Sequence, residues 1–194
     1  MTGRRFALVD RDGTINVEVD HLEAPDQLVL IPGSAAAIRR LRELGLGIAI
    51  VTNQAQVGRG LLSPDQLDRI HDRLRSVLAE QDATVDAVLY CPHPPEDGCD
   101  CRKPLPGMAL EAADRFGFDP AEAFVVGDHA GDMGMGRAIG ATTILVRTGH
   151  GEHERARAQG MADHVVADLG AAVAIIAGIV APGIGVARTQ ETST

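Results

Sequence analysis

Tryptophan is absent from this 194-residue chain, and aromatic residues make up only 3% of it. The core must therefore be built mainly from alanine, valine, isoleucine and leucine. No uninterrupted apolar run approaches the roughly 20 residues that a membrane-spanning helix needs. The apolar run after Arg4 and Arg5 covers only residues 6–9, which is too short for a signal peptide. We therefore expect no membrane partner and a cytoplasmic location.

Positive charge is in the minority, with 18 lysine and arginine residues against 27 aspartate and glutamate residues and a formal net charge of −9. This balance argues against a protein that binds nucleic acid nonspecifically, because phosphate backbones attract basic surfaces. A local pocket can still be basic, so a small phosphorylated ligand stays open. Cysteine is limited to three clustered residues, which do not make a disulfide framework. Reduced thiols are the expectation.

The rest of the composition, 45% hydrophobic and 23% charged, is that of an ordinary globular protein. The length suits one domain with a real core. We expect a single domain over residues 1–180, a flexible polar tail over 181–194, and a monomer.

Apolar strands alternate with amphipathic helices along the chain. We expect strands at 5–9, 47–51, 87–91, 123–128 and 142–149, helices at 33–45, 63–81 and 107–117, and a short strand and last helix within 163–178. This alternation predicts an α/β fold, a three-layer Rossmann-like parallel sheet of about five to six strands. No large cap domain is expected; the sizeable loops are 16–31, 53–62 and 91–106.

Two carboxylates, Asp10 and Asp12, follow the first strand, and Asp128 follows the fourth. In parallel sheets ligands bind at the carboxyl ends of the strands. An Asp-Gly turn is the purely structural alternative for the first pair. Three converging carboxylates would repel one another without a cation, and Mg²⁺ prefers oxygen ligands together with substrate phosphate. The pattern therefore predicts a magnesium site.

Thr52 and Lys103 occupy comparable positions after the second and third strands. Thr52 can donate its hydroxyl to a phosphate oxygen, or it can cap a turn. Lys103 follows the cysteine loop and can neutralise a phosphate, although a solvated surface charge is the usual role of a lysine.

Cys91, His93, Cys99 and Cys101 form a cluster of soft or borderline ligands in the loop 91–106. Four such ligands suit tetrahedral zinc, and a site with four protein ligands has no open position, so it is structural rather than catalytic. Thiols without a metal are one alternative. A zinc-knuckle nucleic-acid binder is another, although the net charge and the absence of flanking basic and aromatic residues other than Tyr90 argue against it.

Two further patterns resemble functional sites. The glycines of residues 134–140 are spaced one residue too far apart for a dinucleotide-binding fingerprint, so helix–sheet packing is the better explanation. Residues 150–154 contain two histidines. A second metal site is one interpretation, and an ordinary loop is the preferred one. His21, His71 and His164 are interpreted as surface or core histidines.

Four motifs, in order, resemble those of the haloacid-dehalogenase-type phosphatases. They are "VDRDGTIN" (9–16), "VTNQ…GRG" (51–60), "CDCRKPLPGM" (99–108) and "VGDHAGD" (126–132), and the resemblance covers about residues 6–150. The cysteine loop and "LVRTGHG" are most similar to the branch that removes the 7-phosphate of D-glycero-D-manno-heptose 1,7-bisphosphate. The related branch with the same first motif and zinc loop acts on histidinol phosphate.

The resemblance implies a Mg²⁺-dependent phosphomonoester hydrolase. Asp10 would attack phosphorus and form an aspartyl-phosphate, and Asp12 would act first as general acid and then as general base. Thr52 and Lys103 would hold the phosphoryl oxygens. Asp10, Asp128 and the backbone carbonyl of Asp12 would bind the Mg²⁺.

We expect the small phosphorylated sugar to be contacted by residues near the strand ends: Arg11, Asp12, Thr52, Asn53, Gln54, Arg59, Arg102 and Lys103. Asp132 would orient Lys103 or a metal-bound water. The chain departs from the family pattern at His129, where a lysine is common, and at Ala55, where a serine is common.

Overall fold

The computed structural model describes residues 4–180. Its centre is a six-stranded parallel sheet with the strand order β3-β2-β1-β4-β5-β6. The strands are β1 (Phe6–Val9), β2 (Gly47–Asn53), β3 (Ala87–Cys91), β4 (Phe124–Gly127), β5 (Thr142–Val146) and β6 (His164–Val166). The predicted α/β fold and its parallel sheet are confirmed.

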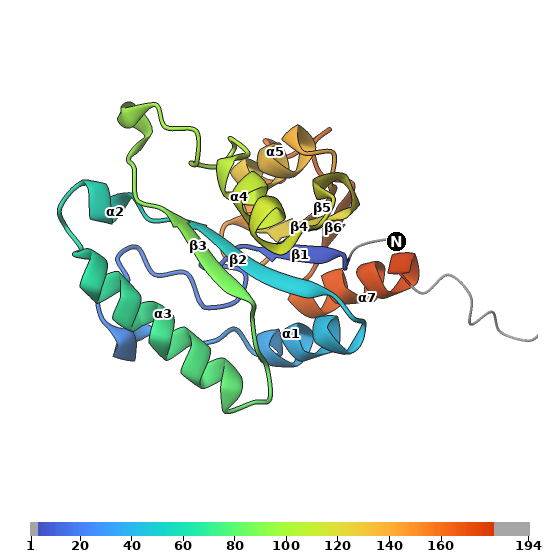
Figure 1. Ribbon diagram of the computed structural model, residues 1–194, viewed down its shortest axis with the longest axis horizontal. Coiled ribbons are helices and arrows are strands. Elements are labelled where there is room, and N and C mark those ends of the chain that lie inside the picture. The colour runs from blue at the N-terminus through green and yellow to red at the C-terminus, as the bar shows by residue number, and fades with distance from the viewer. Residues whose placement is uncertain (1–3, 181–194) are drawn as a thin grey trace, which may run out of the picture.

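Helices cover both faces of this sheet and make the molecule three-layered (Figure 1). The helices are α1 (Ser34–Glu43), α2 (Ala55–Gly58), α3 (Pro64–Ala79), α4 (Gly107–Phe116), α5 (Ala130–Ala138), α6 (Gly151–Glu154) and α7 (Leu169–Val180). α1, α3 and α7 share one hydrophobic cluster with the sheet, and α4 and α5 share another on the opposite face. Successive residues of β1 alternate between the two clusters, because side chains of a strand point to opposite faces.

Local signals in the sequence account for where the helices begin and end. α3 starts with a capping box, in which the Ser63 side chain accepts a hydrogen bond from the Gln66 backbone and Pro64 occupies the first turn. α4 ends at Gly117, whose φ of +67° favours glycine. These two boundaries agree closely with the predicted helices 63–81 and 107–117.

The structure differs from the prediction in its loops. The predicted loop 53–62 contains the short helix α2, and the segments Pro25–Gln27, Pro95–Asp97 and Pro120–Glu122 form 3₁₀ turns. β5 ends at Val146 rather than continuing to 149, because the chain turns at Gly149, which has a φ of +55°. The predicted tail 181–194 lies outside the described residues. Among residues 4–180, every helix is too short or too polar to cross a bilayer.

The order in which the chain adds strands to the sheet reverses once, at the centre of the sheet between β1 and β4. From β1 the chain moves outward through β2 and β3, and from β4 it moves outward the other way through β5 and β6. The neighbouring strands β1 and β4 therefore form a topological switch point, where the loops at the carboxyl ends separate and leave a crevice.

Candidate active site

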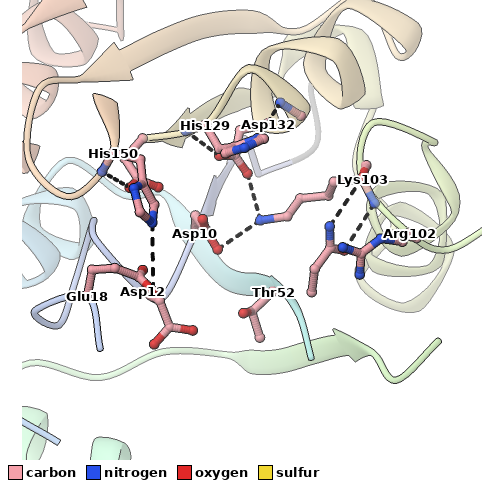
Figure 2. Close-up of a pocket in the computed structure, with 12 residues that line it drawn as sticks. Asp10, Asp12, Glu18, Thr52, Arg102, Lys103, His129, Asp132 and His150 are labelled. Carbon is pink, nitrogen blue, oxygen red and sulfur yellow. Dashed lines mark hydrogen bonds and ion pairs between the residues drawn. The ribbon is translucent and has the colours of Figure 1, made fainter. Parts of the chain in front are cut away.

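Three carboxylates meet at this switch point. Asp10 follows β1, Asp128 follows β4, and Asp132 lies in the first turn of α5; Figure 2 labels Asp10 and Asp132. One oxygen of each carboxylate lies within 4.8 Å of the others. Gly13 has a φ of +74°, and a Cβ there would collide with the Asp128 carboxylate. The Asp-Gly turn and the functional carboxylates are thus parts of one arrangement, since only glycine allows the approach.

Lys103 is the cation that holds two of these carboxylates. Its Nζ lies 2.8 Å from Asp10 Oδ1 and 2.6 Å from Asp132 Oδ1, and it donates a hydrogen bond to the Val51 carbonyl at 2.9 Å. The side chain is only 5% exposed. Burial alone would lower the pKa of Lys103, but the Asp10 and Asp132 carboxylates outweigh it and raise that pKa. Lys103 is therefore a buried charge, and it orients Asp10, whereas Asp132 orients Lys103.

The cluster carries more negative charge than one lysine balances. Burial, reinforced by Asp132, raises the pKa of Asp10 to about 6 despite the opposing effect of Lys103. Burial and the Asp10 carboxylate raise the pKa of Asp128 to about 8, although the Asp128 carboxylate accepts a 2.7 Å hydrogen bond from the His150 backbone. These shifts mean that the fold brings carboxylates together at an electrostatic cost that a bound cation would relieve.

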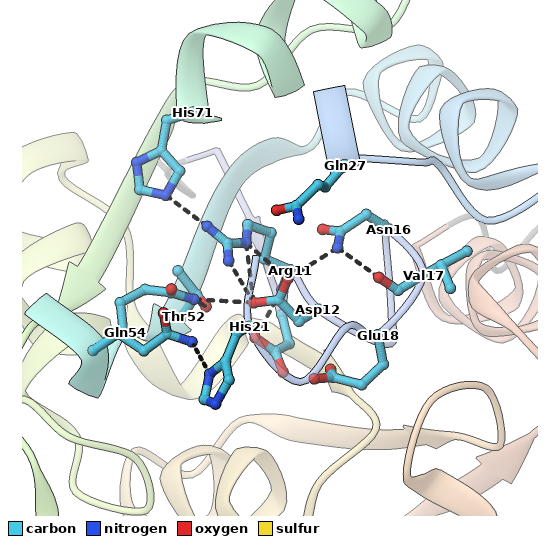
Figure 3. Close-up of polar contacts among 12 residues, drawn as sticks. Arg11, Asp12, Asn16, Val17, Glu18, His21, Gln27, Thr52, Gln54 and His71 are labelled. Atoms are coloured by element: carbon cyan, nitrogen blue, oxygen red, sulfur yellow. Dashed lines mark hydrogen bonds and ion pairs between the residues drawn. The ribbon is translucent and has the colours of Figure 1, made fainter. Parts of the chain in front are cut away.

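Asp12 differs from the other carboxylates because it is surrounded by donors (Figure 3). It accepts hydrogen bonds from Arg11, from Asn16 Nδ2 at 2.9 Å and from Gln54 Nε2 at 3.0 Å. Burial alone would raise the pKa of Asp12, but Arg11 and these amide donors hold it below its ordinary value. Its side chain thus has several partners within the protein, and the role of its backbone carbonyl as a metal ligand stays a prediction.

A cavity of about 200 Å³ opens over these groups. Its lining includes the predicted residues Asp10, Asp12, Thr52, Asn53, Arg102, Lys103 and Asp128. Thr52 is buried, and its hydroxyl accepts a 2.9 Å hydrogen bond from Gln54. The structure therefore brings together the predicted catalytic side chains from three separate stretches of the chain, and the predicted metal ligand Asp128 from a fourth.

Sequence reasoning missed two residues of this cavity, Glu18 and His150. Glu18 comes from the loop 16–31, and its Oε1 lies 3.9 Å from His150 Nε2. Burial, together with the charges of Asp12 and Asp10, raises the pKa of Glu18 to about 7. No local pattern marks Glu18, because the path of a long loop decides that it reaches the cavity.

Three of the predicted substrate contacts have other partners. Arg11 is only 1% exposed, and its guanidinium faces Asp12 and His71 instead of the cavity over Asp10. Gln54 bridges Asp12 and Thr52. Asn53 pairs its side-chain amide with the backbone of Lys103, donating to the carbonyl at 3.2 Å and accepting from the N–H at 3.1 Å. This geometry gives Arg11, Asn53 and Gln54 partners within the protein, and their contacts with substrate stay a prediction; of the three, Asn53 also lines the cavity over Asp10.

Arg59 and Arg102 lie nearer to solvent. Arg102 lines the cavity over Asp10 and donates to the His93 carbonyl at 3.3 Å. Arg59 is half exposed, and it lines an adjoining cavity that also includes Glu18 and Gln56. Of these two arginines, Arg102 therefore lines the cavity over Asp10, and Arg59 the adjoining one.

The four soft ligands are also gathered into one cluster. The reactive atoms of Cys91, His93, Cys99 and Cys101 all lie within 4.8 Å of one another. Cys101 Sγ is 3.0 Å from Cys91 Sγ, 3.5 Å from Cys99 Sγ and 3.2 Å from His93 Nδ1. Such spacing suits four ligands around a single small ion.

The remaining patterns have structural roles. Residues 134–140 belong mostly to α5, where Gly134 packs against Pro104 and Gly136 against Thr143 and Val125, as helix–sheet packing predicts. His129 caps this helix by accepting a hydrogen bond from the Gly131 backbone, so it replaces the family's lysine with a cap beside the cavity. His71 is a core histidine.

Comparison with known proteins agrees with this geometry. A family model described as HAD-hydrolase-like matches residues 100–172. The D-glycero-beta-D-manno-heptose-1,7-bisphosphate 7-phosphatase of Pseudomonas aeruginosa is 42% identical over 149 residues, which cover 76% of this chain and 84% of that protein. The enzyme of the same name from Haemophilus influenzae is 37% identical and covers 81% and 89%.

Solved structures give the same result. The crystal structure of D,D-heptose 1,7-bisphosphate phosphatase from B. bronchiseptica, complexed with magnesium and phosphate, has a TM-score of 0.83 and 37% identity, and the match covers 89% of this chain and 97% of that one. The corresponding enzyme from Burkholderia thailandensis has a TM-score of 0.69 and 33% identity over 89% and 98%. The chain belongs to the family of haloacid-dehalogenase-like phosphatases that contains these heptose-bisphosphate phosphatases.

Proposed function

We propose that this chain hydrolyses phosphomonoesters and removes the 7-phosphate of D-glycero-D-manno-heptose 1,7-bisphosphate through an aspartyl-phosphate on Asp10. The observation that carries the proposal is the placement of Asp10 beside Lys103, with Thr52 and Asp12 lining the same cavity. The similarity to named heptose-bisphosphate phosphatases over three quarters of the chain supports the substrate.

In the first half of the reaction, a carboxylate oxygen of Asp10 forms a bond to phosphorus while the bond from phosphorus to the sugar oxygen breaks. Asp12 gives its proton to that sugar oxygen as it leaves. Lys103 and Thr52 stabilise the charge on the phosphoryl oxygens. The donors around Asp12 favour its ionised form, but a phosphate dianion beside Asp10 adds negative charge nearby and raises the proton affinity of Asp12.

In the second half, Asp12 takes a proton from a water molecule whose oxygen forms a bond to phosphorus. The bond between phosphorus and the Asp10 oxygen then breaks, which releases inorganic phosphate and restores the carboxylate. One group thus serves as acid and then as base, and no proton or electron is left over.

The carboxylate cluster fits a magnesium ion, because it supplies hard oxygen ligands that a single lysine does not neutralise. Asp10, Asp128 and the Asp12 carbonyl would hold the ion, and Asp132 stays with Lys103. When bound, Mg²⁺ supplies charge stabilisation for the phosphoryl oxygens. The B. bronchiseptica relative, solved with magnesium and phosphate, supports this assignment.

The sulfur-rich cluster consists of Cys91, His93, Cys99 and Cys101. It fits a structural zinc ion, because four protein ligands leave no open coordination position. Its role in this proposal is to fix the start of the segment that carries Arg102 and Lys103. Arg102 already contacts the backbone of the ligand His93, which ties the cluster to the cavity.

Phosphate release from a panel of sugar bisphosphates and histidinol phosphate tests the proposal. The expected result is a preference for the heptose bisphosphate, with release by the Asp10→Asn variant at background level. Wild-type rates in that variant would overturn the nucleophile. A preference for histidinol phosphate would overturn the substrate and leave the chemistry in place.

Three wider predictions belong to the same proposal. We propose that residues 1–180 fold as one domain, that the protein is a monomer, and that it works in the cytoplasm. Limited proteolysis, sedimentation and cell fractionation test these three statements in turn.

A further inference from the structure

A buried arginine stands behind the Asp12 carboxylate (Figure 3). Arg11 Nε lies 3.0 and 3.1 Å from the two Asp12 oxygens, and Nη2 lies 2.7 Å from Oδ2. A planar guanidinium that donates to both oxygens of a carboxylate fixes its plane as well as its position. The orientation of Asp12 therefore depends on how Arg11 is held.

A histidine from another element holds the far end of this guanidinium. Arg11 Nη1 lies 3.1 Å from His71 Nε2. Because a guanidinium only donates, Nε2 must accept, and the ring is neutral with its proton on Nδ1. Burial, followed by the charge of Arg11, lowers the pKa of His71 to about 3, which agrees with that reading.

The position of His71 is otherwise suited to an apolar residue. It lies on α3 in the stripe of Leu67 and Leu74, where it is 2% exposed, and its ring packs at 5.7 Å from Tyr90. A polar group in such a place needs a hydrogen-bond partner, and its partner is Arg11. A leucine would fill the stripe equally well, so packing alone does not explain the histidine.

We propose that His71 is a positioning residue, which orients Arg11 so that Arg11 holds the Asp12 carboxylate toward the oxygen that leaves phosphorus. This inference rests on the proposed phosphatase function and adds α3 to its machinery. Asn16 and Gln54 also hold Asp12, but each makes a single contact, whereas Arg11 supplies the charge and the two-point contact.

A comparison of leaving groups tests this role. The value of kcat/KM reports on the steps up to departure of the leaving group. A sugar alkoxide needs the proton of Asp12 when it leaves, but p-nitrophenolate does not. We expect His71→Leu to lower kcat/KM for the heptose bisphosphate by about 10- to 100-fold, which is part of the roughly 10²- to 10⁴-fold that general acid catalysis contributes, and to change kcat/KM for p-nitrophenyl phosphate little.

Two variants control for folding and for the lost hydrogen bond. His71→Gln keeps an acceptor near Nε2 and should recover most of the activity on the heptose bisphosphate. Leu74→Ala removes a buried side chain from the same helix without touching Arg11, so it should lower stability and leave the ratio of the two kcat/KM values unchanged. If His71→Leu does not fold, His71→Met of similar volume replaces it.

Equal losses with both substrates, or no loss with either, would overturn the proposal. So would a crystal structure of His71→Leu in which Arg11 still holds Asp12 as in the wild type. If the wild-type protein hydrolyses neither phosphate, the proposed function fails, and that crystal structure still decides whether His71 positions Asp12.

Discussion

The chain builds its two clusters of metal-binding side chains in opposite ways. The carboxylate cluster joins Asp10 to Asp128 and Asp132, which are buried and come from the two central strands and α5. The sulfur-rich cluster takes the buried Cys91 from the end of β3, and its other three ligands, which are partly exposed, come from the loop that follows this strand. The sheet positions the carboxylates of the first cluster, whereas under our proposal a zinc ion fixes the geometry of the second.

The two clusters also differ in the charges that they bring together. The carboxylate cluster holds like charges together around one buried cation, Lys103. Its stability therefore depends on that cation and, under our proposal, on a bound magnesium ion. Disruption of the sulfur-rich cluster should have a local effect, because its four ligands lie within residues 91–101 and their loss would loosen one loop.

Removal of Lys103 should have the largest effect. Lys103→Met leaves Asp10 and Asp132 buried without their cation, so we expect unfolding free energy to fall by about 3–5 kcal/mol and phosphatase activity to be lost. Urea unfolding with and without Mg²⁺ measures the first effect, and added Mg²⁺ should recover part of it.

The matched control for Lys103 is Arg40, which is half exposed and pairs with Glu43 at 2.9 Å. Arg40→Met should change the unfolding free energy by less than about 1 kcal/mol, since exposed ion pairs contribute little. Similar losses in both variants would show that the carboxylate cluster does not depend on its buried cation.

Disruption of the sulfur-rich cluster should have the second largest effect on activity. Cys101→Ser should lower activity by about 10- to 100-fold, as changes around metal ligands commonly do, and speed hydrogen exchange within residues 91–106. The affinity for Mg²⁺ should stay the same, because the sheet holds those ligands. Full activity after complete removal of zinc would mean that the loop does not position Lys103.

Asn53, at the end of β2, holds the segment between the sulfur-rich cluster and the carboxylate cluster, because its side-chain amide pairs with the backbone of Lys103. Asn53→Ala removes two hydrogen bonds of about 1 kcal/mol each, and we expect kcat to fall by about tenfold with KM nearly constant. Gln56→Ala is the control: Gln56 lies three residues after Asn53, its side chain contacts His21 of the loop 16–31, and kcat should stay the same. A changed KM with an unchanged kcat would instead restore Asn53 as a substrate contact.

Substitution of Asp163, which is far from both clusters in sequence, should have the smallest effect, and that effect is on the unfolding free energy. Burial alone would raise the pKa of Asp163, but hydrogen bonds from Thr143 and the charge of Arg137 hold it below its ordinary value of 3.8. A lowered pKa stabilises the fold above the ordinary value, and this stabilisation is lost as the pH falls through the lowered one. Because Asp163 is partly exposed, Asp163→Asn should cost about 1 kcal/mol at neutral pH, and this cost should shrink as the pH falls below the ordinary pKa. A loss independent of pH would contradict this.

Much of the fold and site follows from local pattern. Alternating strands and helices predict the parallel sheet, and the strand ends predict the convergence of Asp10 with Asp128, because parallel strands bring their carboxyl ends to one edge. The capping box at Ser63 predicts where α3 begins. These features depend on periodicity and chain order, which a sequence displays directly.

Side-chain directions do not follow from such patterns. Arg11 follows Asp10 in the motif, yet it turns inward because His71 of α3 and Asp12 offer it acceptors. Glu18 enters the cavity through the path of a long loop. A histidine in the apolar stripe of residues 63–81 was the one available signal for His71, and its partner appears only when α3 packs against the first strand's loop.

The central claim is that Asp10 carries the phosphoryl group between the two halves of the reaction. Rapid acid quench during turnover, borohydride reduction of the trapped acyl phosphate and peptide mass spectrometry test it directly. Conversion of Asp10 to homoserine is the predicted result. An active enzyme in which Asp10 stays unmodified, or in which another carboxylate is reduced, would contradict it.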